Sequence, residues 1–370
     1  MRTACSLALL LVSATFLPFS TQAGGAQTPL PSIAQQPTPE SSEVQDADHR
    51  ALYAQVLQLF QSAQYAQIDS LAQQLRTQKT RYRGGGWQLT TLYQAIASPG
   101  AMTATDVEWQ ALIDKLQSWI SSYPNSPTPR IALGQAYTKF AWKARGNGFA
   151  NTVTPQGWSL FRERIQSARA ALEDGAAISV NCPEWYRAMQ VVALAQGWPR
   201  KQVDALVQTA LAHDPEYFPI ALAEANYLLP KWYGKPGDTE AYATQVADTI
   251  GGRDGDIVYF FIAAAVNCCR ALQAPVMDET RVQRGFTALD QLYGLTNREL
   301  NMAAFLALRA GDTATAQALF TRIGNNWAAG VWGSKARFDA SRTGQPVGNV
   351  RPIGPPAPPP DQGAAETPSN

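Results

Sequence analysis

Residues 184–217, EWYRAMQVVALAQGWPRKQVDALVQTALAHDPEY, determine the fold that this sequence predicts. Apolar residues recur with the period of one helix face on both sides of the GWPR breaker at residues 197–200, which indicates two amphipathic helices joined by a turn. The 34 residues from Glu184 to Tyr217 match the period of a helix-turn-helix repeat. We expect Pro215 to lie in the first turn of the next helix, with Asp214 as its cap.

The same helical pattern occurs around Pro124. The small, apolar and aromatic positions that flank this proline are Leu112, Leu116, Trp119, Leu133, Gly134 and Tyr137. This stretch resembles a tetratricopeptide repeat, which implies paired helices in close contact. Two more hairpins are suspected, near Gly285 and at Gly311-Asp312, whereas strand-like alternation is scarce. The sequence therefore predicts an all-α protein, an α-solenoid of degenerate tetratricopeptide-like helical hairpins.

The amino-acid composition divides the chain into four predicted segments. Residues 1–23 have Arg2, an apolar run and small residues near Ala23, which is typical of a signal peptide. Residues 24–46 are rich in Pro, Gln, Ser and Thr, and we expect a disordered leader. Residues 47–340 form the predicted helical-repeat domain, and residues 341–370 form a disordered, Pro-rich tail. We expect an exported protein, periplasmic or secreted, with no membrane span in the mature chain.

Charge and motifs argue against several function classes. The chain has 30 basic and 29 acidic side chains, and loss of the signal peptide removes only Arg2, so the mature chain is neutral. Nucleic acid is therefore not an expected partner, because its binding requires an excess of Lys and Arg. The two histidines, His49 and His213, lie far apart in the sequence, and neither a metal-binding motif nor a phosphate loop is present. We predict no catalytic residue, no metal site and no cofactor.

Three cysteines remain after residue 23, namely Cys182, Cys268 and Cys269. The two adjacent cysteines lie in a predicted helix, where neighbouring side chains point about 100 degrees apart, so they cannot bond to each other without distortion. Export makes a disulfide between Cys182 and Cys268 or Cys269 one hypothesis. Buried free thiols are the alternative, because cysteine is often buried when it is unpaired.

Two long loops, at residues 145–158 and 231–238, interrupt the helical pattern and carry many aromatic side chains. If both loops emerge on one face, their rings and cations form a surface suited to a peptide or glycan. The candidate binding residues are Trp142, Arg145, Trp158, Trp185, Lys231, Trp232 and Tyr233. The competing interpretation is that these rings are ordinary packing of the hairpins and loops.

A second resemblance rests on AWKARGNGFANTV, NCPEWYRAM, DPEYFPIALAEANYLLPKWYGKPGD and RAGDTATAQALFTRIGNNWAAGVW. These stretches are similar to an uncharacterised bacterial family, a domain of unknown function whose members also contain tetratricopeptide-like helices. The likeness covers about residues 110–340. It implies the helical fold and export, and it implies no activity, ligand or catalytic residue.

The leading hypothesis is an exported helical-repeat protein that binds another protein or a peptide at the cell envelope. The first alternative is a hydrolase acting on peptide or cell-wall glycan, with Glu184 or Glu224 as acid or base. Such chemistry requires two carboxyl groups that face each other, and nothing in the sequence pairs these two. The second alternative is a structural assembly module. The oligomeric state is left open.

Overall fold

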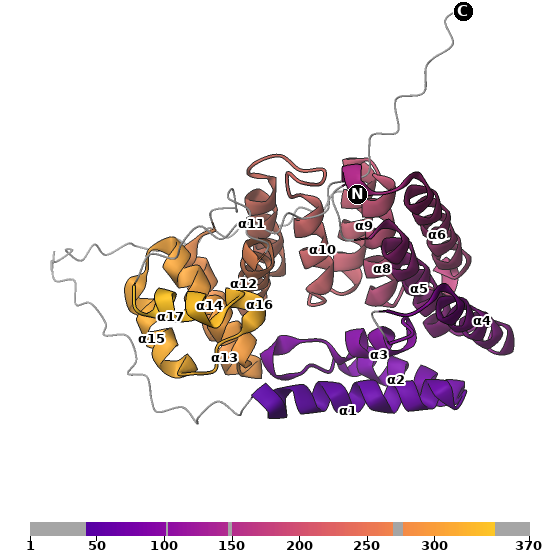
Figure 1. The fold of residues 1–370 in the computed structure, drawn as a ribbon, viewed down its shortest axis with the longest axis horizontal. Helices are drawn as coiled ribbons and strands as arrows, with labels where there is room; N and C mark the ends of the chain where they lie inside the picture. Colours follow the sequence, from indigo (N-terminus) through magenta and orange to yellow (C-terminus); the bar gives the residue numbers. More distant parts are fainter. Residues whose placement is uncertain (1–41, 101–102, 147–149, 269–276, 345–370) are drawn as a thin grey trace, which may run out of the picture. The chain divides into compact units, whose positions relative to one another are not determined.

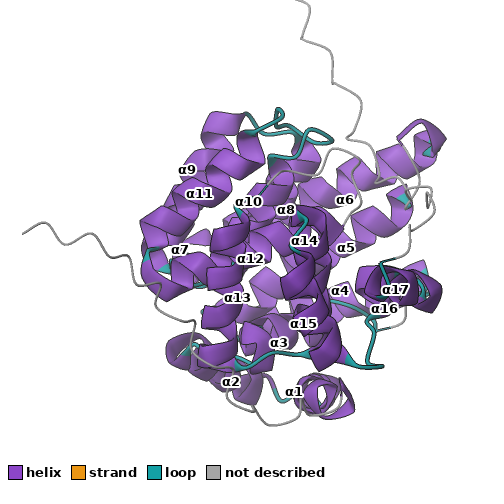
Figure 2. Cartoon of the chain, turned by 90° about the vertical axis from the view of Figure 1, so that its left-hand side faces the viewer, coloured by secondary structure: helices purple, strands orange, loops and turns teal. Residues whose placement is uncertain are grey.

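The computed structural model describes residues 42–100, 103–146, 150–268 and 277–344. All described residues lie in one compact unit. They are helical throughout, with no β-strand among them and one isolated bridge between Arg81 and Trp87 (Figure 1, Figure 2). The predicted all-α class is confirmed. In the same residues, no helix is long and apolar enough to cross a membrane.

Helices follow one another along the described part of the chain, separated by turns and loops. In chain order they are α1 (Ser42–Gln61), α2 (Tyr65–Gln78), η1 (Arg83–Gly85), α3 (Gln88–Ile96), α4 (Asp106–Ser122), α5 (Pro127–Arg145), η2 (Ala150–Thr152), α6 (Pro155–Asp174), α7 (Ala176–Ser179), α8 (Pro183–Gln196), α9 (Arg200–His213), α10 (Pro219–Tyr227), α11 (Asp238–Ile250), α12 (Gly252–Cys268), α13 (Glu279–Tyr293), α14 (Asn297–Ala310), α15 (Thr313–Ile323), α16 (Ala329–Trp332) and α17 (Lys335–Arg342).

Consecutive helices pack as hairpins, and the hairpins pack in sequence. The pairs α5–α6, α8–α9, α10–α11, α12–α13 and α14–α15 are in contact, and α5, α8, α10, α12 and α14 contact one another in turn. Such nearest-neighbour packing is the contact pattern of a helical solenoid. Helix α1 begins at Ser42, five residues before the predicted start of the repeat domain, and α17 ends at Arg342. The predicted signal peptide and most of the predicted leader and tail lie outside the described residues.

The repeat at residues 184–217 folds as predicted, except at its end. Helices α8 and α9 are joined by a turn in which Gly197 has φ 65°, a left-handed conformation that favours glycine. The next helix begins at Pro219 rather than at Pro215. The intervening turn buries Tyr217 and Phe218, and Asp214 forms an ion pair with Lys79 instead of capping the helix.

Two glycines allow helices to approach closely. The turn predicted at Pro124 does join α4 to α5, but Gly134 faces α6, where an added Cβ would lie 2.5 Å from Cγ of Leu172. A Cβ on Gly285, in α13, would lie 2.0 Å from the carbonyl oxygen of Asp256 in α12. Any larger side chain at either position would therefore push a hairpin apart.

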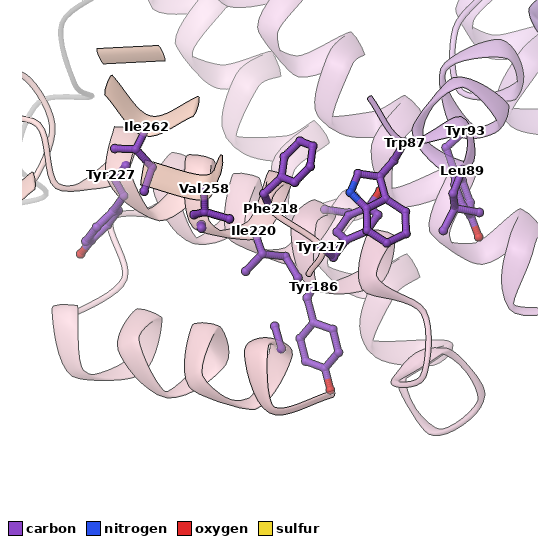
Figure 3. Close-up of a cluster of buried hydrophobic side chains, with 14 of the residues drawn as sticks. Trp87, Leu89, Tyr93, Tyr186, Tyr217, Phe218, Ile220, Tyr227, Val258 and Ile262 are labelled. Carbon is purple, nitrogen blue, oxygen red and sulfur yellow. The ribbon is translucent and has the colours of Figure 1, made fainter. Parts of the chain in front are cut away.

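One segment departs from nearest-neighbour packing. Arg81, which precedes η1, lies over the rings of Trp87 (4.0 Å), Phe218 (5.1 Å) and Tyr293 (5.2 Å). Arg83 donates from Nε to the carbonyl oxygen of Leu295 at 2.8 Å. Figure 3 shows Trp87 beside the Tyr217–Phe218 pair, and the rings of Trp87 and Tyr217 are 4.6 Å apart. The connection between α2 and α3 thus contacts residues more than 100 positions away, which repeat periodicity does not predict.

Candidate functional site

The end of α5 and the loop that follows α10 meet through tryptophans, and Trp158, which was predicted in a loop, lies in the first turn of α6. Trp142, at the end of α5, contacts Trp232 of the α10–α11 loop edge to face, with ring centroids 6.4 Å apart and planes at 82°. Trp142 and Trp158 also pack edge to face on Phe161, at 5.0 Å and 5.7 Å. All three tryptophans remain half-buried. We call Trp142, Trp158 and Trp232 the loop tryptophan cluster.

Arg145 is the centre of this cluster rather than its rim. Its guanidinium carbon lies 5.3 Å from the ring centroid of Trp142 and 5.2 Å from that of Trp158, and the residue is 4% exposed. Burial lowers the pKa of Arg145, although arginine stays protonated in proteins. A buried cation close to two aromatic rings holds them in place, so Arg145 contributes to the packing of Trp142 and Trp158.

The other predicted binding residues separate into two groups. Lys231 precedes Trp232 in the same loop and is half-buried. The ring of Tyr233 turns toward α8–α9, where its hydroxyl donates to the carbonyl oxygen of Leu194 at 3.0 Å. Trp185 does not join the loop tryptophans, because its Nε1 donates to the carbonyl oxygen of Leu172 at 2.9 Å and its ring packs on Tyr186.

Glu184 is the centre of a buried hydrogen-bond network. The residue is 0% exposed, and its carboxylate accepts from Thr90 (Oγ1, 3.0 Å), Gln135 (Nε2, 2.6 Å), Arg187 (Nε, 2.9 Å) and the hydroxyl of Tyr217. Burial alone would raise the pKa of Glu184, but the charge of Arg187 and these donors hold it below its usual value. The carboxylate thus ties α3, α5 and α8 to the turn before α10.

Lys139 lies in the electrostatic field of the same network. Burial and the positive charge of Arg187 together lower the pKa of Lys139 to about 8, and the charge of Glu184 opposes both effects. The position of Lys139 on α5, four residues after Gln135, places it near α8, but no sequence motif marks it. Its proximity to Arg187 depends on the packing of α5 against α8 and could not be derived from the local pattern.

Cys182, which immediately precedes α8, is a buried free thiol in this structure. Its Sγ lies 3.6 Å from the hydroxyl oxygen of Tyr93, and burial raises the pKa of the thiol. The side chains of Cys268 and Cys269 lie outside the described residues. The predicted disulfide between one of them and Cys182 therefore stays a prediction. No group of three His, Cys, Asp or Glu side chains able to hold a metal ion is found in the described part of the chain.

Glu224, the other predicted carboxyl, lines a pocket of about 330 Å³ between α9, α10 and α11. Burial, with a contribution from Asp204, raises its pKa to about 7, while Arg200 opposes the increase. Glu184 does not line this pocket, so the two carboxyl groups of the hydrolase hypothesis do not face each other across it. The sequence offered Glu224 as a candidate but did not indicate the pocket, whose walls come from two successive hairpins.

The comparisons with known proteins give a match to one family model over part of the chain. Residues 52–198 match a family model described as Domain of unknown function (DUF4034). No curated protein and no solved structure matches the chain. The matched span starts nearer the N-terminus and ends earlier than residues 110–340, where the sequence resemblance was placed. It contains Thr90, Gln135, Glu184 and Arg187 of the buried network, but not the pocket at Glu224.

Proposed function

We propose that this chain is an exported helical-repeat protein that binds an acidic peptide segment of another protein at the cell envelope. The contact between Trp142 and Trp232 carries the proposal, because it joins the end of α5 to a loop about 90 residues later in the sequence. Half-buried tryptophans on two adjoining helix ends and a loop offer apolar area that a partner can cover at low entropic cost.

The preference for an acidic peptide comes from the charges of the two loops. Residues 146–154 and 228–237 contain Lys231 and Lys235 and no acidic residue. Lys143, which flanks the cluster, shares the carboxylate of Asp106 with Arg164, so these three groups keep one net positive charge. Recognition would therefore combine aromatic or aliphatic side chains on the loop tryptophan cluster with carboxylates near Lys231 and Lys235.

A peptide library displayed on phage and selected on the immobilised protein tests this function. We expect enrichment of peptides that combine acidic and aromatic residues. An enriched peptide should bind Trp232→Ala or Lys231→Glu roughly tenfold more weakly than the wild type, as judged by fluorescence anisotropy. Lys201→Glu is the matched control, because Lys201 is an exposed lysine of α9 outside both loops, and its effect should be small.

Two outcomes would count against the proposal. No enrichment above an unrelated helical protein would favour the structural assembly module. Equal affinity of the selected peptide for the wild type and Trp232→Ala would remove the loop tryptophans from the interface. Export is tested separately, by mass spectrometry of the N-terminus of the mature protein, which we expect near Gly24.

A further inference from the structure

The pocket at Glu224 has an apolar wall and a polar end. Val207 and Leu211 of α9 and Val246 and Ile250 of α11 line its apolar part, and Glu224 and Tyr242 supply polar atoms. Its volume of about 330 Å³ is near the lower end of the range for small-molecule pockets, so it suits a small ligand or one side chain. The loop tryptophan cluster does not line this pocket, so the two sites are distinct.

Glu224 is deeply buried and unsatisfied. The residue is 1% exposed, and neither carboxyl oxygen has a hydrogen-bond partner among the residues that the structure describes. The hydroxyl of Tyr242 is buried and likewise lacks a partner within that part of the chain. Glu184 shows the opposite arrangement, with four donors around its carboxylate. An unpaired buried polar group costs stability, so these two groups at one pocket end point to an absent partner.

The charged side chains around the pocket favour one sign of charge on the ligand. Arg200, the cation beside Glu224, is engaged by Asp204 (3.4 Å) and by Asp238 (2.8 Å). Two carboxylates therefore compensate one guanidinium before Glu224 is counted. The net charge of these three groups is already −1 and becomes −2 when Glu224 ionises, which favours a cationic ligand over an anionic one.

We propose that this pocket binds an alkylammonium group, with Glu224 and the Tyr242 hydroxyl accepting hydrogen bonds from the ammonium and the apolar wall covering the alkyl chain. A free primary amine and the side chain of a lysine in a peptide share this chemistry. Glu224 binds as its carboxylate, so a protonated Glu224 must release its proton when the ammonium enters.

Calorimetric titration of the full-length wild-type chain tests the inference without any substitution. The probes are n-hexylamine, 1-hexanol and hexanoate, at pH 6 and at pH 8.5. Hexylammonium should bind roughly tenfold or more tightly than hexanol or hexanoate at pH 8.5, because only it can pair with the carboxylate. The affinity for hexylammonium should be about tenfold weaker at pH 6 than at pH 8.5. Binding at pH 6 should also release close to one proton, which titrations in two buffers of different ionisation enthalpy measure.

The variants locate the binding site. Glu224→Gln keeps the side-chain shape and should reduce hexylammonium affinity roughly tenfold at pH 8.5, while Glu163→Gln, which alters an exposed acid of α6, should have no effect. A short peptide with one central lysine distinguishes the two sources, since binding of the peptide as well as of hexylamine indicates a lysine side chain. Absence of saturable hexylammonium binding, equal binding of hexanol, or unchanged binding by Glu224→Gln would each overturn the proposal.

Discussion

Replacing Glu224 by glutamine is expected to remove a large pH dependence from the stability of this protein. Glu224 of α10 is buried at the pocket between α9 and α11, and its pKa rises from 4.5 to about 7 in the folded chain. The ionisable groups that act on it are Arg200 and Asp204 of α9, with Tyr242 of α11 and Tyr227 of α10 also nearby. Glutamine fills the same space and cannot ionise.

The direction of this pH dependence follows from how tightly the folded and unfolded states bind the Glu224 proton. The folded state holds the Glu224 proton more tightly than the unfolded state, so this group's contribution to stability is complete below pH 4.5 and is lost as the pH rises through 7. An increase of roughly 2.5 units in pKa corresponds to about 3 kcal/mol, of which about 2.5 kcal/mol is lost between pH 5 and pH 8.5.

Urea unfolding followed by circular dichroism at several values between pH 5 and pH 8.5 measures this effect. The difference in unfolding free energy between Glu224→Gln and the wild type should move in favour of the variant by about 2 to 3 kcal/mol across this range. Glu163→Gln, at an exposed acid, should show a flat difference. A flat difference for Glu224→Gln as well would refute the reasoning, because Glu224 would then titrate equally in both states.

Three further results follow from the packing. Glu184→Ala should cost about 3 kcal/mol in urea unfolding, because it leaves the half-buried guanidinium of Arg187 and several buried donors without their acceptor. Gly134→Ala should cost about 1 to 3 kcal/mol through collision between α5 and α6, whereas Gly330→Ala, with open space around its Cβ position, should have little effect; equal melting temperatures for the two variants would contradict this packing. Cys182 should resist alkylation in the native protein and react once it is unfolded, which peptide mass spectrometry can follow; rapid native labelling would show that the thiol is accessible.

The helices themselves could be predicted because their signals are local. The apolar period and the breakers at Pro124 and residues 197–200 identify α4–α5 and α8–α9 from neighbouring residues alone. The start of α10 could not be placed in this way. Asp214-Pro215 has the local chemistry of a helix start, but burial of Tyr217 and Phe218 delays the helix to Pro219.

Amino-acid order by itself determined the all-α class, the turns at Pro124, at residues 197–200 and at Gly311-Asp312, and the approximate position of the two aromatic loops. The turn predicted near Gly285 is wrong, because Gly285 lies inside α13. Only the tertiary structure decided that Trp142 meets Trp232 while Trp185 packs elsewhere, that Glu184 is fully hydrogen-bonded, and that Glu224 is not. The physical reason is the sequence separation of the residues that interact. A helix is specified by residues three or four positions apart, whereas the environment of a side chain depends on which helices pack together and at what register, and those contacts join residues tens of positions apart.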